Sequence, residues 1–227
     1  IPFTLYERDS HFEQRSQGYG LTLQQASRAI QALGIVALKN GVISTRHVVH
    51  NAEGRILGEW GIRKRGEAET NASPKRTNIH IARQSLRAVI LEQLQSNDAV
   101  KWGHQLVDVE QSEGKGAKLS FCVDGHLKHV TADLVVGADG IRSKVRKLHI
   151  DEERSPLCYL GCIVILGICP LSKLEGLESD LLDSATVFQT ANGNERIYMM
   201  PFTSDSVMWQ LSFPMTETEA QTLSKQG

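Results

Sequence analysis

The sequence predicts an α/β fold that contains two kinds of sheet: a parallel one backed by helices and a separate, mostly antiparallel one. The first observation is the short apolar run Leu134–Val136, which leads into a glycine-containing turn and then a basic helix. The second is the amphipathic helix Arg83–Leu94, which directly follows a strand-like segment. The third is the region from Leu160 to Phe213, where long apolar, β-branched runs follow one another as strands.

At the start of the chain, Phe3–Tyr6 reads as a strand that ends at Glu7. An acid at the tip of the second strand of a dinucleotide-binding fold can accept hydrogen bonds from both hydroxyls of the adenosine ribose. The alternative is a solvated surface acid. Leu23–Leu33 follows with a helical stripe that stops at Gly34, and Gly41–Trp60 then changes to a strand-like period.

In the middle of the chain, the polar stretch Arg63–Pro74 has no apolar period and is predicted to be a mobile surface loop. Arg83 then opens the helix. A positive charge at a helix N-terminus is unfavourable, because it opposes the helix dipole. The planar guanidinium of Arg83 can, however, donate two hydrogen bonds to a phosphate or a ring carbonyl, which favours a functional role for Arg83. Strands between Val100 and Val130 are expected to form a small antiparallel meander, with Asp124–Gly125 as a hairpin turn.

The strand Leu134–Val136 is expected to be buried and to end at residues with little or no side chain: Gly137, Ala138 and Gly140. Asp139 stands where a helix N-cap belongs, because its carboxylate can accept from the first N–H groups of the next helix. Such a turn lets a bulky ligand approach backbone donors at a positive helix end. The alternative is an ordinary glycine-rich turn after a buried strand.

This Gly-Ala-Asp-Gly turn, followed at once by Ile-Arg-Ser-Lys-Val-Arg, resembles the Asp-Gly fingerprint of the FAD-dependent aromatic-ring monooxygenases, the family typified by p-hydroxybenzoate hydroxylase. The resemblance implies a flavoprotein with an FAD-binding Rossmann-like domain and a mostly antiparallel substrate-domain sheet. It also implies an oxidoreductase in which NAD(P)H reduces FAD and a small, aromatic organic substrate is hydroxylated by O₂ through a flavin hydroperoxide.

The resemblance further implies that nine residues bind the cofactor. They are Glu7, Arg8, Arg15, Gly20, Arg83, Leu106, Val107, Asp139 and Gly140. Arg15 has a surface charge as its alternative. No catalytic side chain and no metal ligand are expected, because the cofactor supplies the hard chemistry.

In domain terms, the resemblance implies that residues 1–42 and 78–153 belong to the FAD-binding domain, and that 43–77 and 154–227 are part of the substrate-binding domain. The family's first strand, with its Gly-x-Gly-x-x-Gly phosphate loop, would precede Ile1, and its later Gly-Asp motif would follow Gly227. We therefore expect a fragment truncated at both ends, which expressed alone neither retains FAD nor turns over substrate.

The composition narrows the remaining possibilities. A formal net charge of −1 gives no long-range attraction to nucleic acid or an anionic membrane, and no apolar run approaches the roughly 20 residues of a membrane span. Four cysteines without the paired C-x-x-C spacing of zinc sites are expected to be buried free thiols of a reducing, cytoplasmic compartment, with disulfides as the alternative.

Two other functions compete with the monooxygenase. One is a non-catalytic binding protein, or an inactive fragment, that keeps a flavin-type fold. The other is a nicotinamide-only dehydrogenase, which the combination of Glu7, Arg83 and Asp139–Gly140 disfavours. The resemblance also implies that Glu7, Arg83 and Asp139 converge on one groove, because in that family the corresponding positions stand at element ends that face the same dinucleotide.

Overall fold

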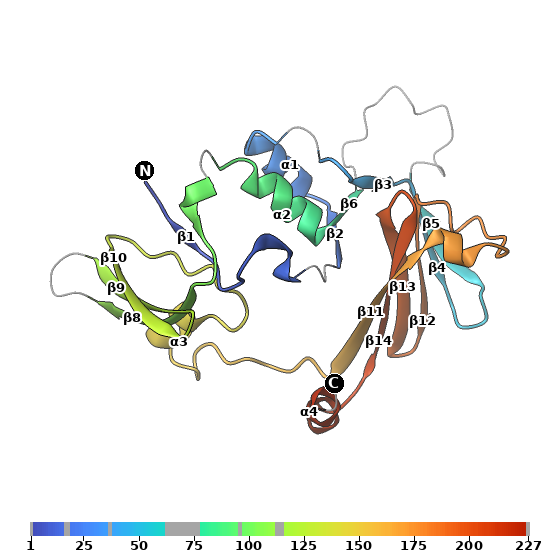
Figure 1. Ribbon diagram of the computed structural model, residues 1–227. Helices are drawn as coiled ribbons and strands as arrows, with labels where there is room; N and C mark the ends of the chain where they lie inside the picture. The colour runs from blue at the N-terminus through green and yellow to red at the C-terminus, as the bar shows by residue number, and fades with distance from the viewer. Residues whose placement is uncertain are drawn as a thin grey trace. The chain divides into compact units, whose positions relative to one another are not determined.

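The computed structural model describes residues 2–15, 19–35, 38–61, 78–94, 97–111 and 116–225 (Figure 1). Its contacts divide the chain into two compact units. Unit 1 comprises Ile1–Ser16 and Leu94–Tyr159, and unit 2 comprises Gln17–Gln93 and Leu160–Gly227. The predicted loop Arg63–Pro74 lies outside the described residues.

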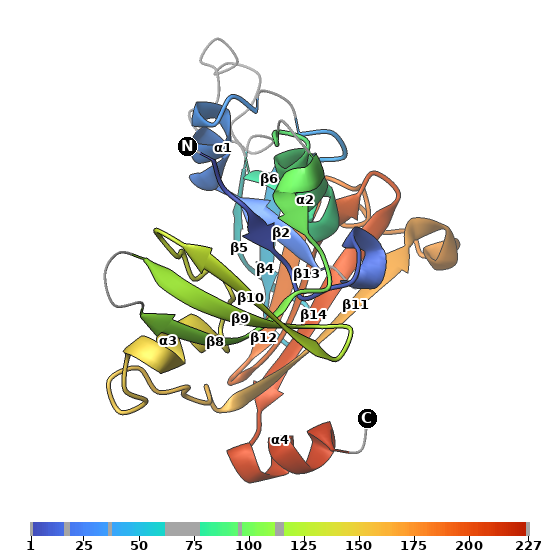
Figure 2. The same cartoon turned by 60° about the vertical axis from the view of Figure 1, so that its left-hand side comes forward.

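Among the described residues, unit 1 contains one parallel strand pair and one antiparallel meander, and the meander is seen in Figure 2. Its elements in chain order are β1 (Leu5–Tyr6), the 3-10 helix η1 (Phe12–Arg15), the 3-10 helix η4 (Asn97–Ala99), β7 (Val100–Lys101), β8 (Gln105–Gln111), β9 (Ala117–Val123), β10 (His126–Ala132) and α3 (Lys144–His149). β1 and β7 pair in parallel, with Leu5 opposite Val100 and Tyr6 opposite Lys101.

The meander has the sheet order β10-β9-β8, as the sequence predicts. Its hairpin turn is confirmed: Asp124 and Gly125 have φ angles of 49° and 79°, the two left-handed residues that a type I′ turn requires. Val109, Leu119 and Phe121 form the buried core of the unit, and side chains of β1 and α3 pack against it. Burial of this apolar cluster holds the first strand and the last helix of the unit on the meander.

The predicted buried strand Leu134–Val136 is wrong, because the structure has no strand there. Leu134 and Val136 are 80% and 79% exposed, and only Val135 packs against the core cluster. The physical reason is pairing: among the described residues no segment supplies a hydrogen-bond ladder to 134–136, and an apolar run becomes a strand only beside a partner.

Among the described residues, unit 2 contains a three-stranded sheet, a six-stranded sheet and three α-helices (Figure 1). The first part of its chain forms β2 (Gly20–Leu23), α1 (Ala26–Ala32), β3 (Val42–Ser44), β4 (Arg46–His50), β5 (Ile56–Trp60), β6 (Asn78–Ala82) and α2 (Arg83–Leu91). The second part forms β11 (Cys162–Pro170), η5 (Leu171–Leu174), β12 (Thr186–Asn192), β13 (Glu195–Thr203), β14 (Ser206–Pro214) and a further helix, α4 (Glu217–Ser224).

The six-stranded sheet has the order β11-β14-β13-β12-β4-β5 and is antiparallel except between β12 and β4. It confirms the prediction that the apolar runs after residue 160 form one mostly antiparallel sheet. It also contains the strands of the excursion between residues 41 and 60. The smaller sheet, β2-β6-β3, is antiparallel, and α1 and α2 share a separate cluster of Ile30, Ile35 and Val89.

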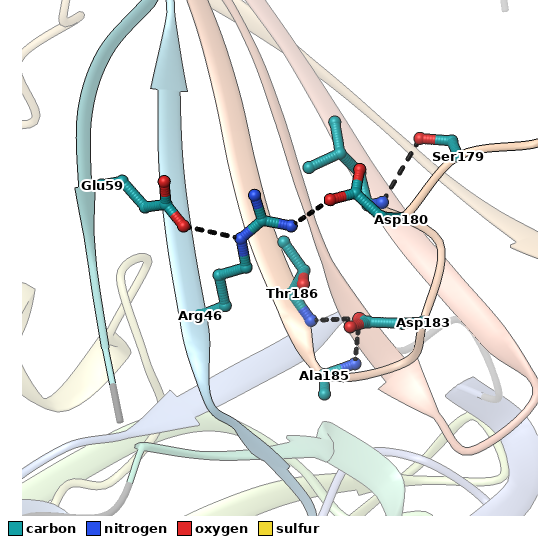
Figure 3. A network of polar contacts seen from close by, with 8 residues as sticks. Arg46, Glu59, Ser179, Asp180, Asp183, Ala185 and Thr186 are labelled. Carbon is teal, nitrogen blue, oxygen red and sulfur yellow. Dashed lines mark hydrogen bonds and ion pairs between the residues drawn. The ribbon is translucent and has the colours of Figure 1, made fainter. Parts of the chain in front are cut away.

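A charged network fastens the acidic segment before β12 to the edge of the six-stranded sheet (Figure 3). Arg46 on β4 donates to Glu59 of β5 at 2.9 Å and to Asp180 at 2.5 Å. Hydrogen bonds to Asp180 and then Glu59 hold the pKa of Arg46 above its ordinary value, although burial opposes them. Asp183 accepts from two backbone N–H groups at the start of β12, so the segment enters the strand in a fixed turn.

Candidate cofactor-binding site

The Asp139–Gly140 turn is organised around the start of α3. One oxygen of the Asp139 carboxylate accepts from the Ser143 hydroxyl at 2.5 Å. The other accepts from the backbone N–H groups of Lys144 at 2.6 Å and Val145 at 3.2 Å. Both oxygens therefore hold the helix start in place.

The N-cap itself is Ser143 and not Asp139, which corrects the sequence prediction. The Ser143 side chain accepts from the Arg146 N–H, and α3 begins at Lys144. Asp139 still satisfies helix N–H groups, but it does so from the preceding loop. Partial burial opposes its ionisation, whereas the bonds from Ser143, Val145 and Lys144 favour the carboxylate and hold the pKa of Asp139 below its ordinary value.

Two glycines of this turn are required by the backbone. A Cβ on Gly137 would lie 2.7 Å from Cβ of Val145, so the loop can approach α3 this closely only without a side chain. Gly140 has a φ of 78°, which side chains rarely tolerate. The prediction that this turn needs residues without bulky side chains is confirmed for Gly137 and Gly140.

Glu7 follows directly after β1, at the carboxyl end of the parallel pair. Its N–H donates to Lys101 O at 3.0 Å, and its carbonyl accepts from His104 N at 2.9 Å. Its carboxylate accepts from the N–H of Asp9 at 3.2 Å and is half-buried. An acid in this position matches the ribose-binding carboxylate of dinucleotide-binding folds.

The two arginines near Glu7 differ in their surroundings. Arg8 is exposed. Arg15, at the end of η1, forms an ion pair of 2.8 Å with the buried carboxylate of Asp9. Asp9 is in turn fixed because its carbonyl accepts from the N–H of Gly103 at 2.8 Å. Arg15 is therefore a positioned cation whose exposed side faces solvent.

Leu106 and Val107 lie at the start of β8. Leu106 packs against the core cluster of unit 1. The register of β8 against β9 shifts between Leu106 and Asp108, so Val107 stands in a β-bulge. A bulge leaves its extra residue out of the ladder, which frees backbone groups at this position for another partner.

The other two predicted residues, Gly20 and Arg83, belong to unit 2. Gly20 opens β2 and is buried, and a Cβ there would lie 2.7 Å from Cε of Met200, so a larger residue would need the end of the Met200 side chain to move. Arg83 is the first residue of α2 and is exposed. Its guanidinium lies 5.8 Å from the centre of the Tyr19 ring, and its N–H donates to the Tyr19 carbonyl.

The structure thus brings seven of the nine predicted residues into one unit and leaves Gly20 and Arg83 in the other. The convergence of Arg83 with Glu7 and Asp139 stays a prediction. Within unit 1, the side chains of Tyr6, Leu106 and Val145 share one hydrophobic cluster. Glu7 and Val107, which directly follow Tyr6 and Leu106, and the turn before Val145 are therefore positioned by the same hydrophobic core.

Sequence reasoning missed His104, which is buried beside β1. Its Nδ1 donates to the carbonyl of Trp102 at 2.7 Å, and its ring lies 5.4 Å from that of Tyr6. Since the carbonyl can only accept, the proton is on Nδ1, and Nε2 is a buried acceptor without a partner among the described residues. Nothing in the local sequence around His104 signals this burial.

The residues of unit 1 fit a dinucleotide by the chemistry of their groups. Glu7 offers a carboxylate acceptor for ribose hydroxyls, Arg15 a cation, and Gly140 an open backbone in a turn. The unpartnered Nε2 of His104, next to Glu7 along the backbone ladder, is a polar atom that a ligand donor could satisfy. The α/β fold is that of the class of dinucleotide-binding proteins, and these residues have the chemistry expected of such a site.

Within this class, the chain belongs to the family described as FAD binding domain, whose profile matches residues 3–222. It is also similar to a kynurenine 3-monooxygenase of Salinispora arenicola (strain CNS-205), with 29% identity over 140 residues. That alignment covers 60% of this chain and 28% of the relative.

The solved structures that share the fold include the following two. Klebsiella pneumoniae HpxO complexed with FAD and uric acid has a TM-score of 0.71 at 16% identity, over 93% of this chain and 50% of that one. P. aeruginosa PqsL in complex with 2-aminobenzoylacetate has a TM-score of 0.68 at 21% identity, over 97% and 56%. The chain therefore spans about half the length of these structures. The predicted FAD-binding fold with a mostly antiparallel second sheet is confirmed.

No helix in the part of the chain that the structure describes is long and apolar enough to cross a membrane. The four cysteines are free thiols. Cys158 is exposed and the other three are half-buried, so the expectation that all four are buried is wrong.

Proposed function

We propose that this chain is part of an FAD-dependent, NAD(P)H-consuming monooxygenase that hydroxylates a small aromatic compound with O₂. The observation that carries the proposal is the match to the FAD binding domain family across residues 3–222, which includes the ordered Asp139–Gly140 turn. Bound FAD would supply the oxygen-activating chemistry, and the protein residues would bind and orient it.

In this proposal the residues of unit 1 hold the adenosine side of the cofactor. Glu7 accepts from the ribose hydroxyls, the bulge at Val107 and its neighbour Leu106 contact the adenine, and Arg8 and Arg15 provide positive charge. Asp139 acts through the turn: since its oxygens are engaged by α3, it fixes the backbone at Gly140 against the cofactor.

Arg83 is proposed to reach the same cofactor from unit 2, with Gly20 allowing close approach. The guanidinium has the right chemistry, because it is exposed, stands over the ring of Tyr19, and has no carboxylate partner among the described residues. We also propose that residues 1–42 with 78–153 bind FAD and that 43–77 with 154–227 bind the substrate, a division by function that differs from the two compact units.

An aromatic substrate is proposed from the relatives. One similar protein is a kynurenine 3-monooxygenase. Two similar structures contain the ring compounds uric acid and 2-aminobenzoylacetate. We further propose a cytoplasmic location, which the four free thiols support.

The test uses the full-length protein, however far it extends beyond the printed chain. It should purify with visible flavin absorbance and oxidise NAD(P)H faster when an aromatic compound is added. Arg83→Met should weaken FAD binding roughly 10- to 100-fold, because a charge-assisted hydrogen bond contributes about 1.5–3 kcal/mol. Arg55→Met, which removes another exposed arginine of unit 2, is the matched control. A flavin-free protein would refute cofactor binding, and a flavin-bound protein without NAD(P)H oxidation would indicate a binding protein.

A further inference from the structure

The two edge strands of the six-stranded sheet differ in how they are protected from pairing with another chain. β5 forms one edge; it carries Glu59, which is paired with Arg46, and its register against β4 is irregular next to His50. β11 forms the other edge; it is nine residues long, contains no charged residue and pairs with β14 without a break in register. Charges and bulges are the usual protection of an edge strand, and β11 has neither.

The backbone of β11 leaves alternate residues unpaired. Just before the strand, the N–H of Met215 donates to the carbonyl of Gly161 at 3.1 Å, and just after it the N–H of Leu171 donates to Asp205 at 2.8 Å. In an antiparallel ladder every second residue bonds to a given neighbour, so the odd-numbered residues of β11 face β14. Four N–H groups therefore point away from β14 and have no backbone partner among the described residues: those of Cys162, Val164, Leu166 and Ile168.

The side chains of β11 are open on both faces of the sheet. Val164, Leu166 and Ile168 lie on one face and are 49%, 44% and 47% exposed, and Ile165 lies on the other face and is 43% exposed. A layer packed over the sheet would cover only one of these two sets. A further strand beside β11 would contact both sets, and it would also satisfy the free N–H groups.

A second copy of β11 fits this edge. Leu166 is the middle residue of the strand, so a twofold axis beside it would place Leu166 of the two copies opposite each other. Val164 of each copy would then pair with Ile168 of the other, and the N–H of Cys162 would donate to the carbonyl of Pro170. This arrangement satisfies every free N–H of the edge, and Pro170, which has no N–H, stands at the end of the ladder and supplies only its carbonyl.

We propose that two copies of this protein associate by antiparallel pairing of their β11 strands, centred on Leu166, so that their six-stranded sheets join into one. The backbone hydrogen bonds give the association its direction, and the aliphatic pairs of Leu166 with its own copy and of Val164 with Ile168 add apolar burial. The surface lies within unit 2, and the proposal does not depend on the cofactor.

The first experiment measures the mass of the full-length protein by size exclusion with light scattering. It covers about a 100-fold range of concentration, because dimerisation follows mass action. Leu166→Lys and Leu166→Glu each place like charges directly opposite each other and should raise the dissociation constant of the dimer about 5-fold or more. An equimolar mixture of the two variants should dimerise again, because opposite charges then meet at the axis. Leu57→Lys, at an exposed position of the other edge strand, is the control and should leave the dimer intact.

The second experiment separates the backbone from the side chain. Leu166→Pro removes the central N–H, which β14 does not use, and should raise the dissociation constant about 10- to 100-fold. Leu166→Val, which has nearly the size of proline and keeps the N–H, should change it much less.

Three results would overturn the proposal. One is a protein that stays monomeric over the whole concentration range. Another is a dimer that survives Leu166→Pro, or a mixture of the two charge variants that does not dimerise again. The third is a monomer whose Leu166 N–H is protected from hydrogen exchange, which would show that another segment of the same protein pairs with β11.

Discussion

The buried His80 should make the stability of this protein sensitive to mild acid. His80 is fully buried on β6, and Nε2 has no partner among the described residues. Thr22 faces it from β2 and His47 from β4, and neither supplies a negative charge. Burial, with a smaller contribution from His47, lowers the pKa of His80 to about 4. Protonation of the folded protein is therefore strongly opposed.

The sign and size follow from linkage. The folded state binds fewer protons than the unfolded state, in which a histidine has a pKa of about 6.5. The stabilisation by neutral His80 is complete above about pH 6.5 and is lost as the pH falls towards about 4. Each pH unit in that interval is equivalent to about 1.4 kcal/mol, so about 2 kcal/mol is lost between about pH 7 and pH 5. Burial lowers the pKa of His47 as well, which adds in the same direction.

The assay is urea unfolding of the protein at about pH 7 and pH 5, which gives the free energy of unfolding at each. His80→Gln and His80→Phe both remove the titrating group, and both should lose less of their own stability over this interval than the original protein does. His126→Gln, at an exposed position next to the β9–β10 turn, is the control and should behave like the original protein. An equal loss of stability in the original protein and in both His80 variants would refute the reasoning.

Three further predictions concern contacts that the structure defines. Asp139→Asn should destabilise the protein by about 1 kcal/mol in thermal unfolding, since an amide group then faces helix N–H donors; Asp139→Ala should cost at least as much, and a neutral result for both would contradict the capping role. Gly137→Ala should cost about 1–3 kcal/mol because its Cβ meets Val145, and a double-mutant cycle with Val145→Ala should recover part of this, whereas additive effects would disprove the clash. For the ion pair of Arg46 with Glu59, a cycle of Arg46→Met and Glu59→Gln should give a coupling of about 1 kcal/mol that decreases in high salt; a salt-independent or zero coupling would show that the pair is not electrostatic.

The sequence by itself determined the features that depend on local chemistry. The Asp124–Gly125 hairpin, the start of α2 at Arg83 and the strands after residue 160 are all found where local signals predict them. These features follow from backbone preferences and from side-chain periodicity, which act within a few residues. The Asp-Gly turn also belongs to this group, because its sequence motif resembles that of the family before any geometry is known.

The tertiary structure decided everything that depends on a partner far along the chain. Leu134–Val136 has the composition of a strand but has no hydrogen-bond ladder among the described residues, and the strand β1 pairs with β7 instead. The parallel pairing of β12 with β4 joins segments more than a hundred residues apart, and local signals contain no information on such pairing.

The same division applies to the candidate site. The nine cofactor residues were predicted from sequence motifs. Only the fold shows that Asp139 accepts hydrogen bonds from the start of α3 and that His104 is buried with one nitrogen that has no partner among the described residues. The buried cluster of Val187, Met200 and Met208 is not visible in the sequence, because a shift of one residue in strand register would send each side chain to the other face of the sheet. Register is set by burial and hydrogen bonding over the whole sheet, and therefore only the assembled sheet brings these three side chains together.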